Sequence, residues 1–320
     1  MSVILNALEY LGYVLVFPGF LFCLLVGLFL TGLDRKLVAW MQKRVGPPIL
    51  QPFYDFFKLC GKETIVPAAA NKTVFLAAPL VGFAALVVLQ LFIPIFGWSA
   101  FSGTADVIVL LYLLLIPAMA IMLGGSASGS PYAGVGVSRE MVTLLSCELP
   151  LVLVLLAVGK VAGGESVTFS MSKIAAYQLE NGSLILRPSL IPAALAFLLI
   201  IPGETGNHPF DTSEAETEIC EGLLAEYSGA PLAVFRLSHS IKTLTLTSLF
   251  AALFLGGLGT GIIVVDALIL VAVSIVLTAL TISLVHAVTA RLKIEQVFKF
   301  YWTVVSALAL ISLVLAWYGL

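Results

Sequence analysis

The sequence predicts an all-α fold, a polytopic membrane helix bundle of about eight transmembrane helices with one interfacial amphipathic helix, in a single integral membrane domain over 1–320. Composition is the first reason, because 60% of the 320 residues are hydrophobic and 11% are charged, whereas soluble domains carry about a quarter charged residues. The second reason is that long uncharged runs recur, each near the ~20 apolar residues that cross a bilayer core. Membrane β-strands would instead alternate over about ten residues.

The predicted spans follow these apolar runs in chain order. They are 11–33, 72–97, 105–125, 139–160, 188–203, 232–257, 262–286 and 298–318. If the spans alternate in direction, most of the 16 Lys and Arg residues fall in or beside the loops after the odd-numbered spans. The positive-inside rule therefore predicts a multi-pass protein of the cytoplasmic membrane with its N-terminus outside.

The first polar segment, 34–72, is predicted to be a cytoplasmic loop that contains the amphipathic helix. Phe53, Phe56, Phe57 and Cys60 recur at helical spacing after a turn at 46–48, as in a helix that lies at the interface. A positive-inside anchor would explain the cations alone. Because the segment also contains acids, a docking surface for a soluble partner is the second interpretation.

The second segment, 124–140, is rich in Gly and Ser but lacks the G-K-[ST] ending of a phosphate-binding loop, which argues against nucleotide binding. Arg139 and Glu140 follow it, and an interfacial ion pair at a helix start would explain both. Glu148 is harder to explain structurally, because it lies two turns into an apolar helix, just before Pro150. A charge there costs about 2.5–3.5 kcal/mol, so Glu148 is predicted to be functional.

The third segment, 203–231, is predicted to be an acidic cytoplasmic loop, and it contains no Lys or Arg. Seven of the 18 acids lie in it, namely Glu204, Asp211, Glu214, Glu216, Glu218, Glu221 and Glu226. The run 211–213 resembles a helix N-cap, and Glu214, Glu218 and Glu221 would share one face of the helix that follows. A solvated acidic loop is the alternative. If part of it is buried, its carboxylates titrate as a coupled set with raised pKa values and can pass protons.

Three cationic or titratable residues, Arg236, His239 and Lys242, begin the sixth span and offer partial charge compensation. His208 and His239 have no metal-site spacing and are expected to form hydrogen bonds or to pack. The four cysteines form no C-x-x-C pair, so no metal or cluster is expected in this chain and packing roles are expected for them. No nucleophile-base pair stands out, and the chain is expected to catalyse no reaction alone.

These segments resemble the membrane subunit shared by respiratory complex I (the H subunit of NADH-quinone oxidoreductase) and the energy-converting membrane-bound [NiFe] hydrogenases. The matching stretches are DRKLVAWMQKRVGP with LQPFYDFFKLCGKE, REMVTLLSCELP, ETGNHPFDTSEAETEICEGLLAEYSG and RLKIEQVFKFYW. The resemblance implies a subunit between a peripheral redox arm and antiporter-like membrane subunits, which couples electron transfer to proton or sodium translocation through buried carboxylates. Iron-sulfur clusters and a [NiFe] or related centre would lie in hydrogenase-like large and small partner subunits, with ferredoxin as electron donor and no nucleic-acid partner.

The resemblance also implies roles for individual residues. The relay would include Glu140, Glu148, Glu204, Asp211, Glu214, Glu216, Glu218, Glu221 and Glu226, accompanied by Arg139, Arg236, His239 and Lys242. The docking surface would include Arg35, Lys36, Arg44, Gln51, Asp55, Lys62 and Glu63.

One feature departs from complex I. Only Pro48 and Ile49 separate Pro47 from Leu50, where complex I members have a longer loop that frames the quinone cavity. The short loop resembles the hydrogenase branch and its ferredoxin-driven, sulfur-reducing relatives. Two alternatives stay open: the quinone-site H subunit of an NADH-quinone oxidoreductase, and a free-standing secondary transporter whose intramembrane charges bind substrate.

Overall fold

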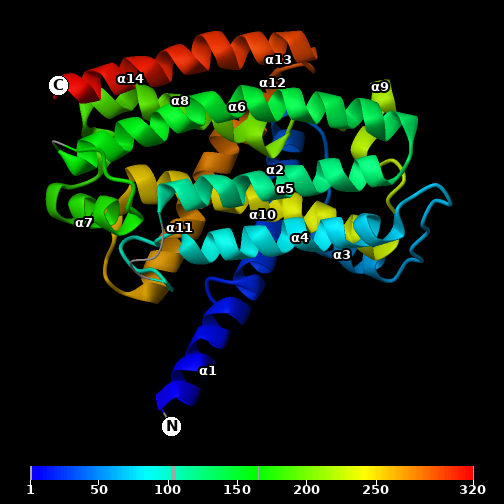
Figure 1. Ribbon diagram of the computed structural model, residues 1–320, viewed down its shortest axis with the longest axis horizontal. Coiled ribbons are helices and arrows are strands. Elements are labelled where there is room, and N and C mark those ends of the chain that lie inside the picture. The colour runs from blue at the N-terminus through cyan, green and yellow to red at the C-terminus, as the bar shows by residue number, and fades with distance from the viewer. Residues whose placement is uncertain (1, 102–105, 165, 320) are drawn as a thin grey trace.

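The computed structural model describes residues 2–101, 106–164 and 166–319, and these residues form a helical bundle (Figure 1). Apart from two isolated bridges, the ordered elements among them are helices. The α-helices are α1 (Ser2–Leu15), α2 (Phe20–Met41), α3 (Gln51–Cys60), α4 (Lys72–Phe92), α5 (Val107–Ala127), α6 (Pro131–Gly163), α7 (Met171–Asn181), α8 (Ile191–Thr205), α9 (Glu216–Ile219), α10 (Gly229–Phe254), α11 (Ile263–Thr278), α12 (Leu284–Val288), α13 (Ile294–Phe300) and α14 (Ser306–Tyr318). Short π-helical turns, Ala279–Ser283 and Tyr301–Val305, join α11 to α12 and α13 to α14.

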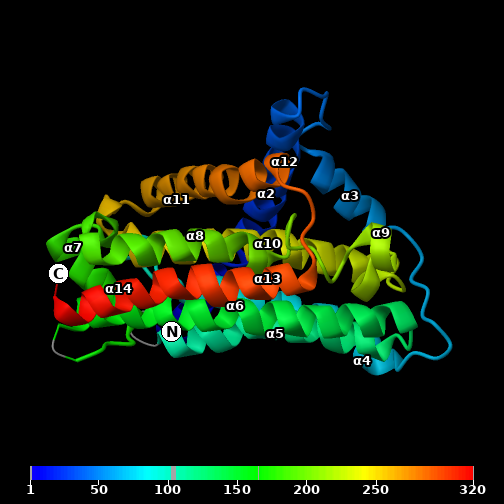
Figure 2. The ribbon, with the colours of Figure 1, turned by 90° about the horizontal axis from the view of Figure 1, so that it is seen from above.

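Several long helices run beside one another, and α10 lies among them. In Figure 2, α11 and α12 lie on one side of the bundle and α4 and α5 on the other, with α8 and α10 between them. Helix α2 crosses the others and packs closely on α10, where a Cβ on Gly27 would lie 3.2 Å from the Ser240 carbonyl. Helix α1 projects from the bundle (Figure 1).

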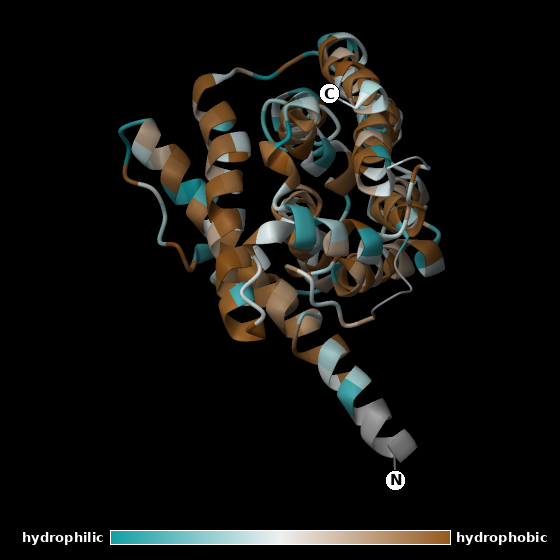
Figure 3. Ribbon diagram, turned by 90° about the vertical axis from the view of Figure 1, so that its left-hand side faces the viewer, coloured by the Kyte–Doolittle hydropathy of each residue, from teal (hydrophilic) through white to brown (hydrophobic). Residues whose placement is uncertain are grey.

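Seven helical segments of the described chain are long and apolar enough to cross a membrane. Hydrophobic residues dominate the helices, and hydrophilic ones lie in loops and on some helical turns (Figure 3). The predicted sixth span, 232–257, corresponds to α10, which is not among these seven. Helix α10 has 26 residues, contains Arg236 and Lys242, and is buried over most of its length. Its hydroxyls are satisfied locally: Ser238 and Thr247, for example, donate to carbonyls four residues earlier, which lets a polar helix lie in a packed interior. The prediction of a polytopic helical membrane bundle is confirmed.

The predicted boundaries of the first span and of the following loop are wrong. The helix breaks before Phe20, next to Pro18, whose ring cannot continue a helix, and α2 then extends to Met41. Asp34, Arg35 and Lys36 therefore lie on α2 and not in a loop. The predicted amphipathic helix is present as α3, with Pro52 in its first turn.

The predicted acidic helix after 211–213 is also wrong, because α9 has only 4 residues. The side chains expected to cap it are used elsewhere: Ser213 Oγ donates to Glu140 at 2.6 Å, and Thr212 Oγ1 lies 3.3 Å from Thr143 Oγ1. The chain leaves α9 through Cys220 and Glu221, both with positive φ. Glu214 and Glu221 thus flank α9 and do not share a helix face with Glu218.

The prediction that the cysteines are packing residues holds for two of the four. Cys23 and Cys147 are buried, whereas Cys60 and Cys220 are exposed at the end of α3 and directly after α9. For the two exposed cysteines the prediction is wrong, because each lies where a helix ends at the surface.

Candidate functional site

The centre of the candidate site is a buried ion pair between α8 and α10. Lys242 Nζ lies 3.1 Å from Glu204 Oε1, and the two side chains are 11% and 3% exposed. Glu204 lies in the last turn of α8, and Lys242 lies midway along α10. Because an unpaired charge in such surroundings is costly, each side chain stabilises the charged form of the other.

A cavity of about 430 Å³ opens beside this pair. It is bounded by α2, α3, α5, α6, α8, α10, α12 and the loop that carries α9. Its acidic lining comprises Asp34, Glu140, Glu204, Asp211, Glu214 and Glu221, among others. Leu28, Phe56, Pro117 and Phe235 form apolar parts of the wall. Charged groups from distant segments thus share one internal space.

Glu214 lies half-buried at this cavity, in the loop between α8 and α9. Burial raises the pKa of Glu214 to about 7, and the negative charges of Glu140 and two other carboxylates add to the rise, while Arg236 opposes it. Glu140 in turn accepts the hydrogen bond from Ser213. A carboxyl group with a pKa near neutrality can both accept and release a proton under physiological conditions.

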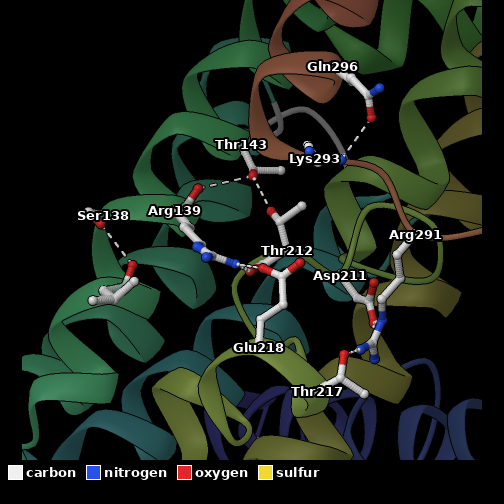
Figure 4. Close-up of polar contacts among 11 residues, drawn as sticks. Ser138, Arg139, Thr143, Asp211, Thr212, Thr217, Glu218, Arg291, Lys293 and Gln296 are labelled. Atoms are coloured by element: carbon white, nitrogen blue, oxygen red, sulfur yellow. Dashed lines mark hydrogen bonds and ion pairs between the residues drawn. The ribbon is translucent and has the colours of Figure 1, made fainter.

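Asp211 joins the acidic loop to the segment before α13. Arg291 donates to Asp211 Oδ2 from Nε at 3.0 Å and approaches it with Nη2 at 2.9 Å, and its Nη1 donates to Thr217 (Figure 4). His208 Nδ1 lies 2.7 Å from the same oxygen, and the rings of His208 and His286 are 5.0 Å apart. The other oxygen of Asp211 is buried and has no hydrogen-bond partner within the described residues.

Two further ion pairs hold the loop at its surface. Arg139 on α6 pairs with Glu218 at 2.6 Å and donates to the Thr212 carbonyl at 3.2 Å (Figure 4). Arg236 on α10 lies 3.7 Å from Glu221. Although 203–231 contains no Lys or Arg, four of its seven acids pair with a Lys or Arg from another segment, namely Glu204, Asp211, Glu218 and Glu221.

The predicted relay residues divide into two groups. Those that line the cavity are Glu140, Glu204, Asp211, Glu214, Glu216, Glu221, Arg236, His239 and Lys242. Arg139 and Glu218 lie outside it as a surface pair, and Glu226 is exposed. Glu148 is half-buried on α6, within electrostatic range of Glu204.

The predicted docking residues lie on α2, α3 and their flanking loops. Arg35 Nη1 donates to Asp55 at 3.1 Å and Gln51 donates to Asp55 at 2.9 Å, so Asp55 ties α3 to α2. The remaining members of the set are exposed, namely Lys36, Arg44, Lys62 and Glu63.

Sequence reasoning missed three groups at the site: Asp34, His286 and Arg291. Ser283 Oγ donates to Asp34 at 2.7 Å, and Asp34 lines the cavity. The signal for Asp34 was its helical spacing from Gly27 and Thr31, which places it on the face of α2 that meets α10. His239 bonds with Asn207 at 3.0 Å, which agrees with the expected hydrogen-bonding role. Among the described residues, no group of three or more His, Cys, Asp and Glu could hold a metal ion.

Comparison with known proteins places this arrangement in a family. The family described as NADH dehydrogenase matches residues 14–317. Hydrogenase-4 component C of Escherichia coli is 35% identical over 248 residues, 76% of each chain. The H subunit of the NADH-quinone oxidoreductase of Thermomicrobium roseum is 33% identical over 310 residues, 89% of each chain.

A solved structure agrees with these relatives. A chain of the membrane-bound sulfane sulfur reductase (MBS), an archaeal respiratory membrane complex, superposes with a TM-score of 0.86 at 30% identity, over 97% of this chain and 98% of that one. The resemblance drawn from the sequence motifs is confirmed. The chain belongs to the NADH dehydrogenase family, whose members include membrane subunits of complex I-like and hydrogenase-type respiratory complexes.

Proposed function

We propose that this chain is the membrane-anchoring and coupling subunit of a ferredoxin-driven, ion-translocating hydrogenase-type complex. Electron transfer in a peripheral arm would be linked to proton or sodium movement through the carboxylates of the cavity and Glu148. The chain would carry no redox cofactor, and iron-sulfur clusters and a [NiFe] or related centre would lie in partner subunits.

The observation that carries this proposal is the shared internal space. Glu214, in the loop outside the spans, and Glu204, paired with Lys242 in the interior, line the same cavity, and Glu148 lies within electrostatic range of Glu204. Glu140 lies within electrostatic range of both Glu214 and Glu204, so a change of charge at the loop can act on the interior through it. Carboxylates in such positions characterise proton and ion pathways.

The surface around α3 supports a docking role toward the peripheral arm. Lys36, Arg44 and Lys62 are exposed there, and a cationic surface suits acidic or polar partner loops. Docking on this face would place it in the cytoplasm and the N-terminus outside. The antiporter-like subunits would then contact another face of the bundle within the bilayer.

The test is Glu148→Gln in the intact complex, reconstituted in liposomes with reduced ferredoxin. Gln keeps the shape and removes the charge and the titration, so ion transport per electron falls severalfold while assembly is kept. Glu180→Gln is the matched control, because Glu180 is exposed on α7. Unchanged transport in Glu148→Gln would refute the relay.

Quinone binding is the second candidate, favoured by the apolar wall at Leu28, Phe56 and Pro117 and by the relatives that are H subunits of NADH-quinone oxidoreductases. A quinone-site inhibitor that binds the purified complex, and that binds the Phe56→Ala variant more weakly, would support quinone binding. Purification in mild detergent separates both candidates from a free-standing transporter, which would be isolated without iron-sulfur partners.

A further inference from the structure

A second, smaller cavity lies beside the first, where α2, α10 and the end of α11 meet. Its volume is about 20 Å³, and one water molecule needs a cavity of roughly 10–15 Å³ or more. Thr31, Asp34, Asn207 and His239 line both cavities. The smaller cavity is therefore a side chamber of the candidate site, directed toward the interior of the bundle.

The hydroxyl groups around the side chamber are arranged as acceptors. Thr243 and Thr278 donate to the backbone carbonyl four residues earlier, at 3.4 and 2.7 Å. Thr31 has two acceptors for its one proton, the Gly27 carbonyl at 3.1 Å and Ser240 Oγ at 2.9 Å. A hydroxyl has one proton and two lone pairs, so each threonine that uses its proton on its own helix can still accept a hydrogen bond. These three hydroxyls come from three different helices.

Asp34 adds negative charge to this set of acceptors. Ser283 occupies one of its carboxylate oxygens, and a carboxylate accepts about four hydrogen bonds in total. One turn before Thr278, Ser274 is fully buried, and its hydroxyl has no hydrogen-bond partner among the residues described. The polar character of α11 thus continues past the chamber toward the middle of the helix.

We propose that the side chamber binds one small guest that donates hydrogen bonds or carries positive charge, a water molecule or a Na⁺ ion. The guest is held by Asp34, Thr31, Thr243 and Thr278. The other polar groups of the lining already have partners, because Asn207 Nδ2 donates to Thr205 and His239 Nε2 bonds to Asn207 Oδ1. The remaining acceptor oxygens suit a guest that supplies protons or positive charge, and both guests fit the volume. The proposal that the side chamber is occupied rests only on its volume and its acceptor groups. Its use as a staging point for translocated ions rests on the function proposed above.

High-resolution electron cryomicroscopy of the intact complex tests the site, with maps recorded in Na⁺ and in choline at equal ionic strength. We expect one peak within about 2.3–3.2 Å of at least three of the four acceptor groups. A peak in the Na⁺ map alone, or one whose contacts are shorter in Na⁺ than in choline, identifies the ion, and a peak with the same contacts in both maps identifies water. No peak in either map would overturn the proposal.

The double variant Thr243→Val/Thr278→Val removes two acceptors with little change of shape and should lose the peak. If the guest is Na⁺, the rise in melting temperature that Na⁺ gives to the wild-type complex should also disappear, because a ligand that binds only the folded state stabilises it. Thr245→Val is the control, since Thr245 is buried on α10 and donates to the Lys242 carbonyl at 2.9 Å without lining the chamber.

A peak that persists in the double variant would show that the threonines do not hold the guest. Should that variant fail to assemble, the two wild-type maps still decide whether a guest is bound. If Glu148→Gln leaves ion transport unchanged, the relay is refuted but the peak in the wild-type maps still stands. The two proposals therefore fail separately.

Discussion

The buried pair Lys242–Glu204 and the surface pair Arg139–Glu218 use similar chemistry in opposite surroundings. The surface pair is the shorter, at 2.6 Å against 3.1 Å, but its side chains are 25% and 54% exposed, whereas those of the buried pair are 11% and 3% exposed. Exposed pairs contribute about 0–1 kcal/mol because water screens them. Removing one member of a buried pair costs about 3–5 kcal/mol. Distance is therefore a poor guide to which pair matters.

The same contrast separates the two regions that contain these pairs. Helices α8 and α10 hold their charges in a packed interior, whereas the loop around α9 holds its acids with arginines from three other segments. We expect the interior pair to stay in place during turnover and the loop pairs to exchange partners at low cost. Variants at each place test this division.

Lys242→Met should have the largest effect. It leaves Glu204 buried without its partner, and we expect the heat stability of the complex to fall by an amount equivalent to about 3–5 kcal/mol. Lys242→Met/Glu204→Leu should recover most of the loss, since both charges are then removed. Equal loss in the single and double variants would contradict the electrostatic explanation and indicate lost packing.

Arg291→Gln should have the next largest effect, because it removes the bonds to Asp211 and Thr217. Charge-assisted hydrogen bonds contribute about 1.5–3 kcal/mol, and we expect faster proteolysis within 206–228 in the purified complex. Lys299→Gln, at an exposed position on α13, is the control. A loop that remains protected in Arg291→Gln would show that His208 alone holds Asp211.

These contacts also show what could not be predicted from the sequence. Composition and apolar runs were enough to predict the helical bundle. They also predicted α10, although this helix contains Arg236 and Lys242. The pairs Asp211–Arg291 and Arg139–Glu218 join residues 80 and 79 positions apart, and no periodicity relates residues at that separation. The sequence therefore offered only Arg236, His239 and Lys242 as compensation for the acidic loop, whereas the fold also brings Arg139 and Arg291 to it.

Local sequence rules failed where tertiary contacts competed for the same side chains. Residues 211–213 have the composition of a helix cap, but Ser213 bonds to Glu140 and Asp211 to Arg291. These side chains are therefore not available to cap a helix, and the structure has only the short helix α9 where a longer one was predicted. The cost of placing Glu148 in an apolar helix can be judged from one helix alone, whereas the burial of Glu214 depends on the cavity.

Glu214→Gln should change the pH dependence of stability. The pKa of Glu214 is raised to about 7 from its ordinary value of 4.5, so its stabilising contribution is present below pH 4.5 and is lost as the pH rises to about 7. One pKa unit corresponds to about 1.4 kcal/mol, and for a half-buried group we expect a loss of about 1–2 kcal/mol after screening. Melting temperatures between about pH 5 and 8, which cover most of this window and about one unit above it, should therefore fall less steeply in Glu214→Gln. An unchanged slope would show that another group titrates.

The smallest effect is expected at the surface pair, in a double-mutant cycle of Arg139→Gln and Glu218→Gln. Because Glu218 is more than half exposed, the coupling energy should be about 0.2–1 kcal/mol, and it should shrink in 1 M salt, where the screening length is about 3 Å. Melting temperatures of the four complexes at low and high salt give this energy. A coupling above about 2 kcal/mol, or one that salt leaves unchanged, would mean that the pair is shielded from water in the assembled complex. The contrast with Lys242–Glu204 would then belong to the isolated chain and disappear on docking of the peripheral arm.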